Sequence, residues 1–385
     1  MTARTTASRG RRALRAAGIA LFGALLLGAL TLALPVREWR TGEQPVPPLP
    51  PAAGPPAEPA RRVWIDTDAA CGHGRRTDPD DCLALLLLLT DPTLEVAGVS
   101  TVFGNAPLEV TDSVTRALEA ALARAGIARP PVFRGAAAPR RRSSAAQAAA
   151  YAALRDALAA DPLTIVALGP LTNLAAALER RPQLQQRVVR LVAVMGRRAG
   201  HLFHPAEGRG TGGMLLGHGP VFSDFNFEQD PDAAAAVLAA GMPTTLVPYD
   251  VARDVTLDGE DLARLRDAGG ASAWVGARSQ AWLDFWKRDV GRDGFFPFDL
   301  LAAAYAVAPR FFGCADARAW VGRDGRLWGW LWAPRALIVG LERERPRSVR
   351  ASGRVIYCTR ADPALREWLV ARLAPPGGRR PEAAR

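Results

Sequence analysis

Apolar and polar positions alternate along most of this chain in blocks that predict strands and helices in turn. Short apolar runs predict buried strands, and longer segments that are amphipathic or rich in alanine predict helices. Strands that alternate with helices predict an α/β fold with a mostly parallel central sheet and helices on both faces. The predicted strands cover residues 63–68, 96–102, 130–133, 163–168, 188–195 and 244–247, and the predicted helices cover 82–89, 108–125, 145–160, 171–179, 231–240 and 363–373.

Several of the predicted strands end in residues that suit a binding site. In open parallel sheets, ligands bind beyond the carboxyl ends of the strands, where these ends share one edge of the sheet. We therefore interpret the residues at these ends as parts of one candidate site. They are Asp66, Asp68, Asn105, Leu168 and Met195.

The first of these ends belongs to an acidic turn near residue 70. Asp66 and Asp68 end the strand, and the run Asp-Pro-Asp-Asp at 78–81 leads directly into a leucine-rich helix. Crowded like charges cost free energy unless a cation or shared protons compensate them, and carboxylate oxygens are preferred ligands of hard divalent cations. The turn therefore predicts a metal site, although Asp80 and Asp81 alone are equally well explained as acids that favour a helix N-terminus.

The first 60 residues follow a different pattern. Arginines up to Arg15 precede an uncharged apolar run at 16–36, which is typical of an export signal or a membrane anchor. The run is close to the roughly 20 residues that a helix needs to cross a bilayer, which favours an anchor with the rest of the protein outside the cytoplasm. A cleaved segment would instead give a secreted or periplasmic protein. The predicted organisation is an N-terminal signal or transmembrane anchor at 1–36, a proline-rich linker at 37–60, one folded domain at 61–375 and a disordered tail at 376–385.

The positive charge does not predict a nucleic-acid partner. The net charge of +11 comes almost entirely from arginine, because Lys287 is the only lysine. The arginines are scattered along the chain and form no stripe along one predicted face.

The cysteines have no spacing typical of zinc sites. Cys82 lies in the leucine run and is predicted to be a small core residue, whereas Cys71 lies in the acidic turn and could be exposed. A disulfide between Cys314 and Cys358 is possible, but spacing alone does not establish it.

A glycine-rich stretch at 200–219 interrupts the alternation of strands and helices. It carries His201, His204 and His218. Their irregular spacing favours a lid loop over the site and argues against a zinc centre.

Five segments together resemble the nucleoside hydrolase family, whose members include inosine-uridine preferring enzymes. The segments occur in the family's order and cover roughly residues 62–310. The resemblance implies a nucleoside hydrolase-like fold with a Rossmann-like core, and hydrolysis of the N-glycosidic bond of ribonucleosides to ribose and free base. The segments are Asp66-Thr67-Asp68 with Asp80-Asp81, then residues 98–105, 166–174, 224–231 and 298–302.

The resemblance also implies a calcium ion at the base of a pocket. Its ligands would be the carboxylates of Asp68, Asp81 and Asp299 and the main-chain carbonyl of Leu168. The metal would lower the pKa of a bound water, and Asp68 would remove a proton from that water as general base. Attack through an oxocarbenium-like state would invert the anomeric carbon. The residues expected to contact the substrate are Asp80, Asn105, Met195, Asp224 and Asn226.

The chain departs from the family pattern around the base and the sugar. The loop at 69–79 is several residues longer, Asp224 stands where glutamate is common, and His218 stands where many relatives have asparagine. Phe298 occupies a position where some relatives carry a histidine that protonates the departing base. His73 or His218 could serve as the acid instead. Aromatic rings could also stack on the base, although core packing is the favoured explanation for the candidate rings Trp282, Trp286, Phe295 and Phe296.

Two other functions compete with this interpretation. One is a catalytically silent protein of the same fold that binds ribosyl ligands. The other is a haloacid-dehalogenase-type phosphatase with Asp66 as nucleophile, which would need a lysine that Lys287 is poorly placed to supply. The expected partners are a small nucleoside substrate, the membrane through the N-terminal helix, and possibly further copies of the chain, since relatives are commonly oligomeric.

Overall fold

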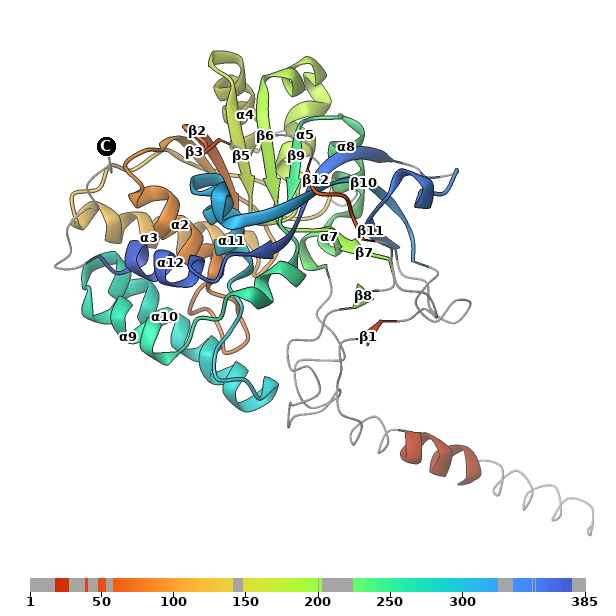
Figure 1. Ribbon diagram of the computed structural model, residues 1–385. Helices are drawn as coiled ribbons and strands as arrows, with labels where there is room; N and C mark the ends of the chain where they lie inside the picture. The colour runs from red at the N-terminus through yellow and green to blue at the C-terminus, as the bar shows by residue number, and fades with distance from the viewer. Residues whose placement is uncertain are drawn as a thin grey trace, which may run out of the picture.

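The computed structural model describes residues 18–27, 39–40, 48–52, 58–140, 148–199, 201–202, 224–324, 335–347, 349 and 351–375. A ten-stranded sheet forms its centre, with the strand order β4-β3-β2-β5-β6-β9-β12-β10-β11-β7 (Figure 1). The strands are β2 (Arg62–Thr67), β3 (Glu95–Thr101), β4 (Val132–Arg134), β5 (Leu163–Ala167), β6 (Val188–Ala193), β7 (Arg197–Arg198), β9 (Thr244–Leu246), β10 (Phe312–Arg323), β11 (Arg335–Gly340) and β12 (Ser352–Ala361). A separate pair joins β1 (Trp39–Arg40) to β8 (His201–Leu202).

The half of the sheet from β4 to β12 is parallel throughout. Its strands are short apolar runs such as Leu163–Ala167, all of whose residues are buried, as expected where helices cover both faces of a sheet. The predicted fold class is confirmed, and the six strands predicted from the sequence all lie in this parallel half.

The sheet continues beyond β9 in a part that the sequence analysis did not predict. β10 pairs antiparallel with both β11 and β12, and β12 joins the parallel half through β9. Cys314 and Cys358 face each other across the β10–β12 ladder and form a disulfide. The disulfide that the sequence left open is therefore present.

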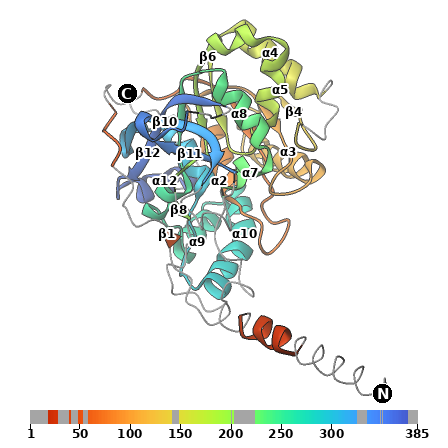
Figure 2. The same ribbon diagram turned by 90° about the vertical axis from the view of Figure 1, so that its right-hand side faces the viewer.

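Helices cover both faces of the sheet (Figures 1 and 2). Successive side chains of a strand point to opposite faces, so Val63 and Ile65 belong to one hydrophobic core and Trp64 to the other. The first core packs against α2 (Asp80–Thr90), α3 (Leu108–Arg124), α9 (Gly259–Asp267), α10 (Gly270–Phe285), α11 (Phe298–Val307) and α12 (Leu365–Leu373), and the second packs against α4 (Ala149–Ala160), α5 (Thr172–Arg180) and α8 (Pro231–Ala239).

Helix α2 is buried along nearly its whole length. Its leucine run has no polar face, which suits a helix enclosed on all sides, and α11, α10, α12 and α3 all contact it. The helix therefore fixes its first residues, Asp80 and Asp81, deep in the molecule. Shorter helical turns complete the fold: α7 (Phe225–Gln229), a π-helical turn at Trp286–Val290, and 3-10 turns at Pro182–Arg187, Tyr249–Asp254, Pro309–Phe311 and Glu342–Glu344.

The prediction of a membrane anchor is wrong. Within the apolar run at 16–36, the structure describes a helix only at 18–27. None of the helices in the described ranges has the length and apolar character to cross a membrane. The location outside the cytoplasm was derived from the anchor, so this prediction loses its support.

Three other expectations fall partly or wholly outside the described residues. These are most of the proposed linker at 37–60, the tail at 376–385, and nearly all of the proposed lid at 200–219, including His204 and His218.

Candidate active site

The candidate site lies at the carboxyl ends of β2, β3, β5 and β6, as the strand pattern predicted. Asp66 pairs in register with Ser100 of β3 and Ala167 of β5, so the residues that follow these strands emerge at one edge of the sheet. The loops after these strands bring Asp68, Asn105, Leu168 and Met195 to that edge. The first turns of α2 and α11 add Asp80, Asp81 and Asp299 and complete the site.

Hydrogen bonds tie Asp81 to the ends of β2 and β3. Its Oδ1 accepts from Thr67 Oγ1 at 2.5 Å and from the backbone amide of Asp68 at 3.2 Å. Its Oδ2 accepts from Asn105 Nδ2 at 3.0 Å. The backbone amide of Asn105 donates to Asp68 Oδ2 at 2.8 Å. The loops after the two strands are thereby fixed to the first turn of α2.

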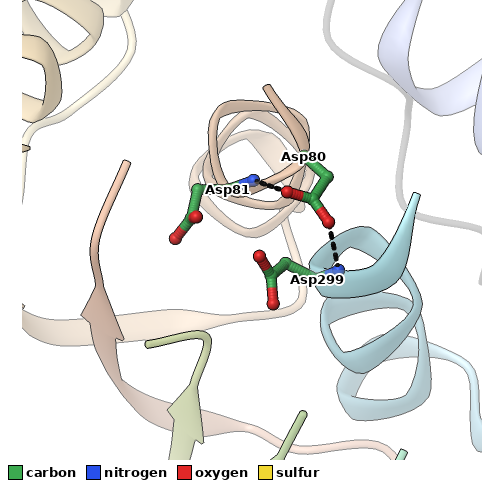
Figure 3. Close-up of side chains that lie close together, drawn as sticks. All are labelled: Asp80, Asp81 and Asp299. Atoms are coloured by element: carbon green, nitrogen blue, oxygen red, sulfur yellow. Dashed lines mark hydrogen bonds between the residues drawn. The ribbon is translucent and has the colours of Figure 1, made fainter. Parts of the chain in front are cut away.

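A second link joins the N-termini of α2 and α11. Asp80 Oδ2 accepts a hydrogen bond from the backbone amide of Asp299 at 2.7 Å, and Asp80 Oδ1 accepts one from the amide of Asp81 at 3.1 Å (Figure 3). One carboxylate oxygen from each of Asp80, Asp81 and Asp299 can be chosen so that all three lie within 4.8 Å of one another. Two distant helices thus converge on one small volume.

Burial raises the pKa of every acid in this cluster. Removal from water is the largest cause for each, and charges on neighbouring carboxylates add to it. The pKa of Asp81 rises to about 6, and the pKa values of Asp68 and Asp299 rise well above their usual value. The pKa of Asp80 also rises. The protein alone therefore does not balance these charges.

Unsatisfied oxygens show that the cluster fits a cation. Asp68 Oδ1 and Asp299 Oδ1 are buried and have no hydrogen-bond partner in the described part of the chain. Buried polar atoms are nearly always paired, and an exception needs a physical explanation such as a bound ion. A donor set of carboxylate oxygens suits a hard divalent ion. The predicted metal site is supported. The three acids whose oxygens lie within 4.8 Å of one another, however, include Asp80, which we had expected to contact only substrate.

The other predicted residues surround the cluster. The carbonyl of Leu168 accepts from Asn226 Nδ2 at 2.5 Å, and Asn226 also donates to Val194 O at 3.2 Å. Asp224 Oδ2 accepts from the amide of Gly196 at 2.7 Å, and burial raises the pKa of Asp224 to about 7. These bonds join the loop after β6 to Asp224 and Asn226, at the start of α7.

A cavity of about 360 Å³ opens above the cluster. Asp68, Asp81 and Leu168 are buried and are not among the residues that line it, so they lie beneath its floor. The substrate-binding candidates from the sequence all line the cavity. Asp78 also lines it; this acid is half-buried, and its pKa is raised by removal from water and by the charge of Asp80. The lining residues are Arg76, Thr77, Asp78, Asp80, Asn105, Val194, Met195, Asp224, Phe225, Asn226, Tyr249, Trp282, Phe285, Phe298 and Asp299.

The aromatic part of the cavity differs from the one considered in the sequence. Of the four candidate rings only Trp282 lines the cavity; Trp286, Phe295 and Phe296 are fully buried, as core packing predicted. The sequence analysis missed Phe285, which lies one turn along α10 from Trp282, with ring centroids 5.1 Å apart. Helical spacing of three residues was the signal that could have found it.

The long loop at 69–79 is tied down by a second disulfide. Cys71 bonds to Cys82 of α2, with the two Cα atoms 6.2 Å apart. The expectation that Cys71 is exposed is wrong, since 2% of its surface is accessible. Cys82 is a core residue as predicted, but it also anchors the loop beside the ligand candidate Asp81.

Three polar residues near the site have structural partners. Asp66 Oδ1 accepts hydrogen bonds from Ser100 Oγ at 2.5 Å and from Asn173 Nδ2 at 2.7 Å. Asn173 also binds the carbonyl of Thr101 and the amide of Ala136, so it fixes the turns around it. Asp230 caps α8. Asp66 is buried and not part of the cavity wall, which argues against a nucleophile at this position.

Comparison with known proteins gives concordant matches. Pyrimidine-specific ribonucleoside hydrolase RihA of Salmonella paratyphi B is 28% identical over 284 residues, or 68% of this chain and 83% of the relative. Non-specific ribonucleoside hydrolase RihC of Escherichia coli is 30% identical over 275 residues, or 65% and 80%. A solved purine-preferring ribonucleoside hydrolase from Gardnerella vaginalis superposes with a TM-score of 0.62 at 20% identity, covering 82% of this chain and 99% of that structure.

These matches bear on the predictions made from the sequence. The relatives are named as ribonucleoside hydrolases, which are N-glycosidases, so the prediction of an enzyme of this class is confirmed. The sequence pattern of inosine-uridine preferring nucleoside hydrolases matches residues 63–353, which is most of the chain. The chain therefore belongs to the inosine-uridine preferring nucleoside hydrolase family.

Proposed function

We propose that this protein is a calcium-dependent hydrolase that cleaves the N-glycosidic bond of ribonucleosides to ribose and free base. The observation that carries the proposal is the convergence of Asp80, Asp81 and Asp299 at the floor of a cavity lined by polar side chains and aromatic rings. The polar groups suit sugar hydroxyls, and the rings suit a planar base.

The acids that we propose as calcium ligands are Asp68, Asp81 and Asp299, with the carbonyl of Leu168. Calcium takes six to eight oxygen ligands, and the unpaired oxygens of Asp68 and Asp299 are available for this purpose. A bound calcium ion would supply Lewis acidity to a water oxygen and would orient sugar hydroxyls. A cation among the acids also favours their charged forms and therefore lowers their raised pKa values.

The protein's own groups perform the remaining steps. Asp68 accepts the proton of the attacking water as general base. Its position is fixed by the amide of Asn105, which donates to its Oδ2. Asp80, Asn105, Asp224 and Asn226 line the cavity and orient the ribose by hydrogen bonds to its hydroxyls. Positive charge that develops on the sugar is stabilised by these buried carboxylates.

The proposal is tested with the purified full chain, freed of metal by a chelator and then supplied with calcium. Inosine, uridine, adenosine and cytidine are assayed for release of the free base. We expect base release that depends on calcium and disappears in Asp68→Asn, while nucleoside binding persists.

Two other results would change the assignment. Nucleoside binding without turnover in the calcium-loaded wild-type protein would favour the silent binding protein. Hydrolysis of a generic phosphate ester would favour a phosphatase. The structure gives the phosphatase little support, because Lys287 pairs with Asp293 at 3.1 Å and does not line the cavity.

A further inference from the structure

Arg76 is the one cationic side chain among the described residues that line the cavity. Its guanidinium carbon lies 5.3 Å from the centroid of the Phe285 ring, a cation–π contact at the aromatic part of the wall. Phe285 contacts Trp282, which lines the same part. A positive charge is thus held where the rings would receive a base.

The chain holds Arg76 in this place through the long loop. The Cys71–Cys82 bond fixes the start of the loop to α2, and the run of acids at 78–81 fixes its end. Gly72 packs so closely against α10 that an added Cβ would lie 2.8 Å from Arg278 Cγ. The loop is therefore docked between α2 and α10, and Arg76 belongs to the built wall of the cavity.

No nearby acid neutralises the charge of Arg76. In the described part of the chain, its guanidinium lies over the Phe285 ring, and no carboxylate forms an ion pair with it. The indole Nε1 of Trp282 is also buried without a hydrogen-bond partner among the described residues. The aromatic part of the cavity therefore offers the charged donor Arg76, and the unpaired indole N–H belongs to a ring of the same wall.

We propose that Arg76 binds the nucleobase and stabilises the negative charge on the base as it departs. This inference rests on the proposed function and adds the chemistry of the leaving group. When the C1′–N bond breaks, its electron pair stays on the base nitrogen, while the water oxygen bonds to C1′ and the water proton goes to Asp68. The base leaves as an anion beside the guanidinium and takes up a proton from solvent.

Charge, not proton transfer, is the contribution that arginine can make. A guanidinium does not lose its proton in proteins, so Arg76 acts by electrostatic stabilisation. Phe298 also lines the cavity and has no proton to give. A fixed cation replaces a general acid in this arrangement.

The same donors select a class of base. Arginine has five N–H donors and no acceptor, and the indole N–H is a donor only. Bases with a carbonyl oxygen at the bound edge, such as hypoxanthine and uracil, accept from these groups. Adenine and cytosine present an exocyclic amino group there, which leaves a buried donor unpaired. These donors would give a physical reason for the preference for inosine and uridine that the family's description names.

The test compares natural ribonucleosides with 4-nitrophenyl β-D-ribofuranoside, whose leaving group is stable as an anion without help. Arg76→Met keeps the length of the side chain and removes its charge, and Arg76→Lys restores a charge. Arg75→Met is the matched control in the same loop, because Arg75 is exposed, as Arg76 is, but does not line the cavity. All four proteins are assayed with calcium for kcat/KM on inosine, adenosine and the nitrophenyl riboside.

For Arg76→Met we expect kcat/KM on inosine to fall roughly 10- to 100-fold, the range of a lost charge-assisted hydrogen bond. The nitrophenyl riboside should be cleaved as by the wild type, the preference for inosine over adenosine should shrink, and Arg76→Lys should recover part of the loss. Equal losses on inosine and the nitrophenyl riboside, or no loss on inosine, would overturn the role of Arg76. A wild-type protein that cleaves neither substrate would refute the proposed function itself.

Discussion

The Cys71–Cys82 disulfide should matter more for the metal than for the stability of the fold. Cys82 directly follows the proposed ligand Asp81, and Cys71 anchors the loop that carries Arg76. We predict that the double variant Cys71→Ala/Cys82→Ala folds but binds calcium more weakly. The Cys314–Cys358 bond lies in the antiparallel part of the sheet and provides the matched control, since its removal also deletes two sulfur atoms.

The sequence separations set the expected magnitudes. A disulfide stabilises mainly by closing a loop in the unfolded chain, and its effect grows with the logarithm of loop length. The 11-residue separation of Cys71 and Cys82 corresponds to about 3 kcal/mol of unfolding free energy. The 44-residue separation of Cys314 and Cys358 corresponds to about 4 kcal/mol. Loss of a support beside a metal ligand typically costs roughly tenfold in metal affinity.

Two measurements on both double variants decide the matter. Urea unfolding of the metal-free proteins gives the free energy of unfolding, and calorimetric titration with calcium gives the dissociation constant. Stability should fall further in the Cys314/Cys358 variant, whereas calcium affinity should fall only in the Cys71/Cys82 variant. If both variants keep the wild-type affinity for calcium, then the loop does not support the metal site and the reasoning fails.

Three further predictions concern the acids and the metal. An added Cβ at Gly104 would overlap the Asp68 carboxylate. Gly104→Ala should therefore lower the free energy of unfolding by about 1–3 kcal/mol and abolish calcium binding. Calcium binding as in the wild type would contradict the observed packing. Calcium at a hundred times its dissociation constant should stabilise the wild type by about 2.7 kcal/mol, measured by thermal melting with and without chelator, and Asp299→Asn should remove most of this gain. Burial raises the pKa of Glu119 to about 7 from its usual 4.5, so the folded state holds an extra proton between these values and loses stability as pH rises through them. Glu119→Gln should therefore match the wild type near pH 4 and exceed it at pH 8 by on the order of 1–2 kcal/mol, and an unchanged difference across that range would refute the shift.

The parallel half of the fold could be predicted because its signal is local. Runs such as Leu163–Ala167 are apolar without interruption, and glycine, proline or acidic residues end them. The antiparallel part was missed because β10 carries half-exposed and charged residues along its twelve positions, so its burial does not follow a clean alternation. The second disulfide was missed because Cys71 lies in a polar turn, and only the folded loop shows that its side chain is buried.

The candidate site was predictable where it depends on strand ends and on the family's segments. Asp80, Asp81 and Asp299 converge, and the backbone amide of Asp68 donates to Asp81, because the carboxyl ends of parallel strands and the starts of two helices share one edge of the sheet. The ligand set of Asp68, Asp81 and Asp299 stays a prediction. The aromatic wall of the cavity was predictable only in part. Phe285 could have been found from its helical spacing to Trp282, whereas Arg76 reaches the cavity only through the docking of the long loop, which no spacing in the sequence encodes.

The hydrogen bond between Asp80 and the amide of Asp299 joins positions 219 residues apart in the chain. During synthesis on the ribosome, the acids of α2 emerge long before their last companion does. If these acids hold calcium, as we propose, a nascent chain would complete the ion's site only after Asp299 has emerged. Retained calcium would then distinguish finished molecules from interrupted or clipped ones.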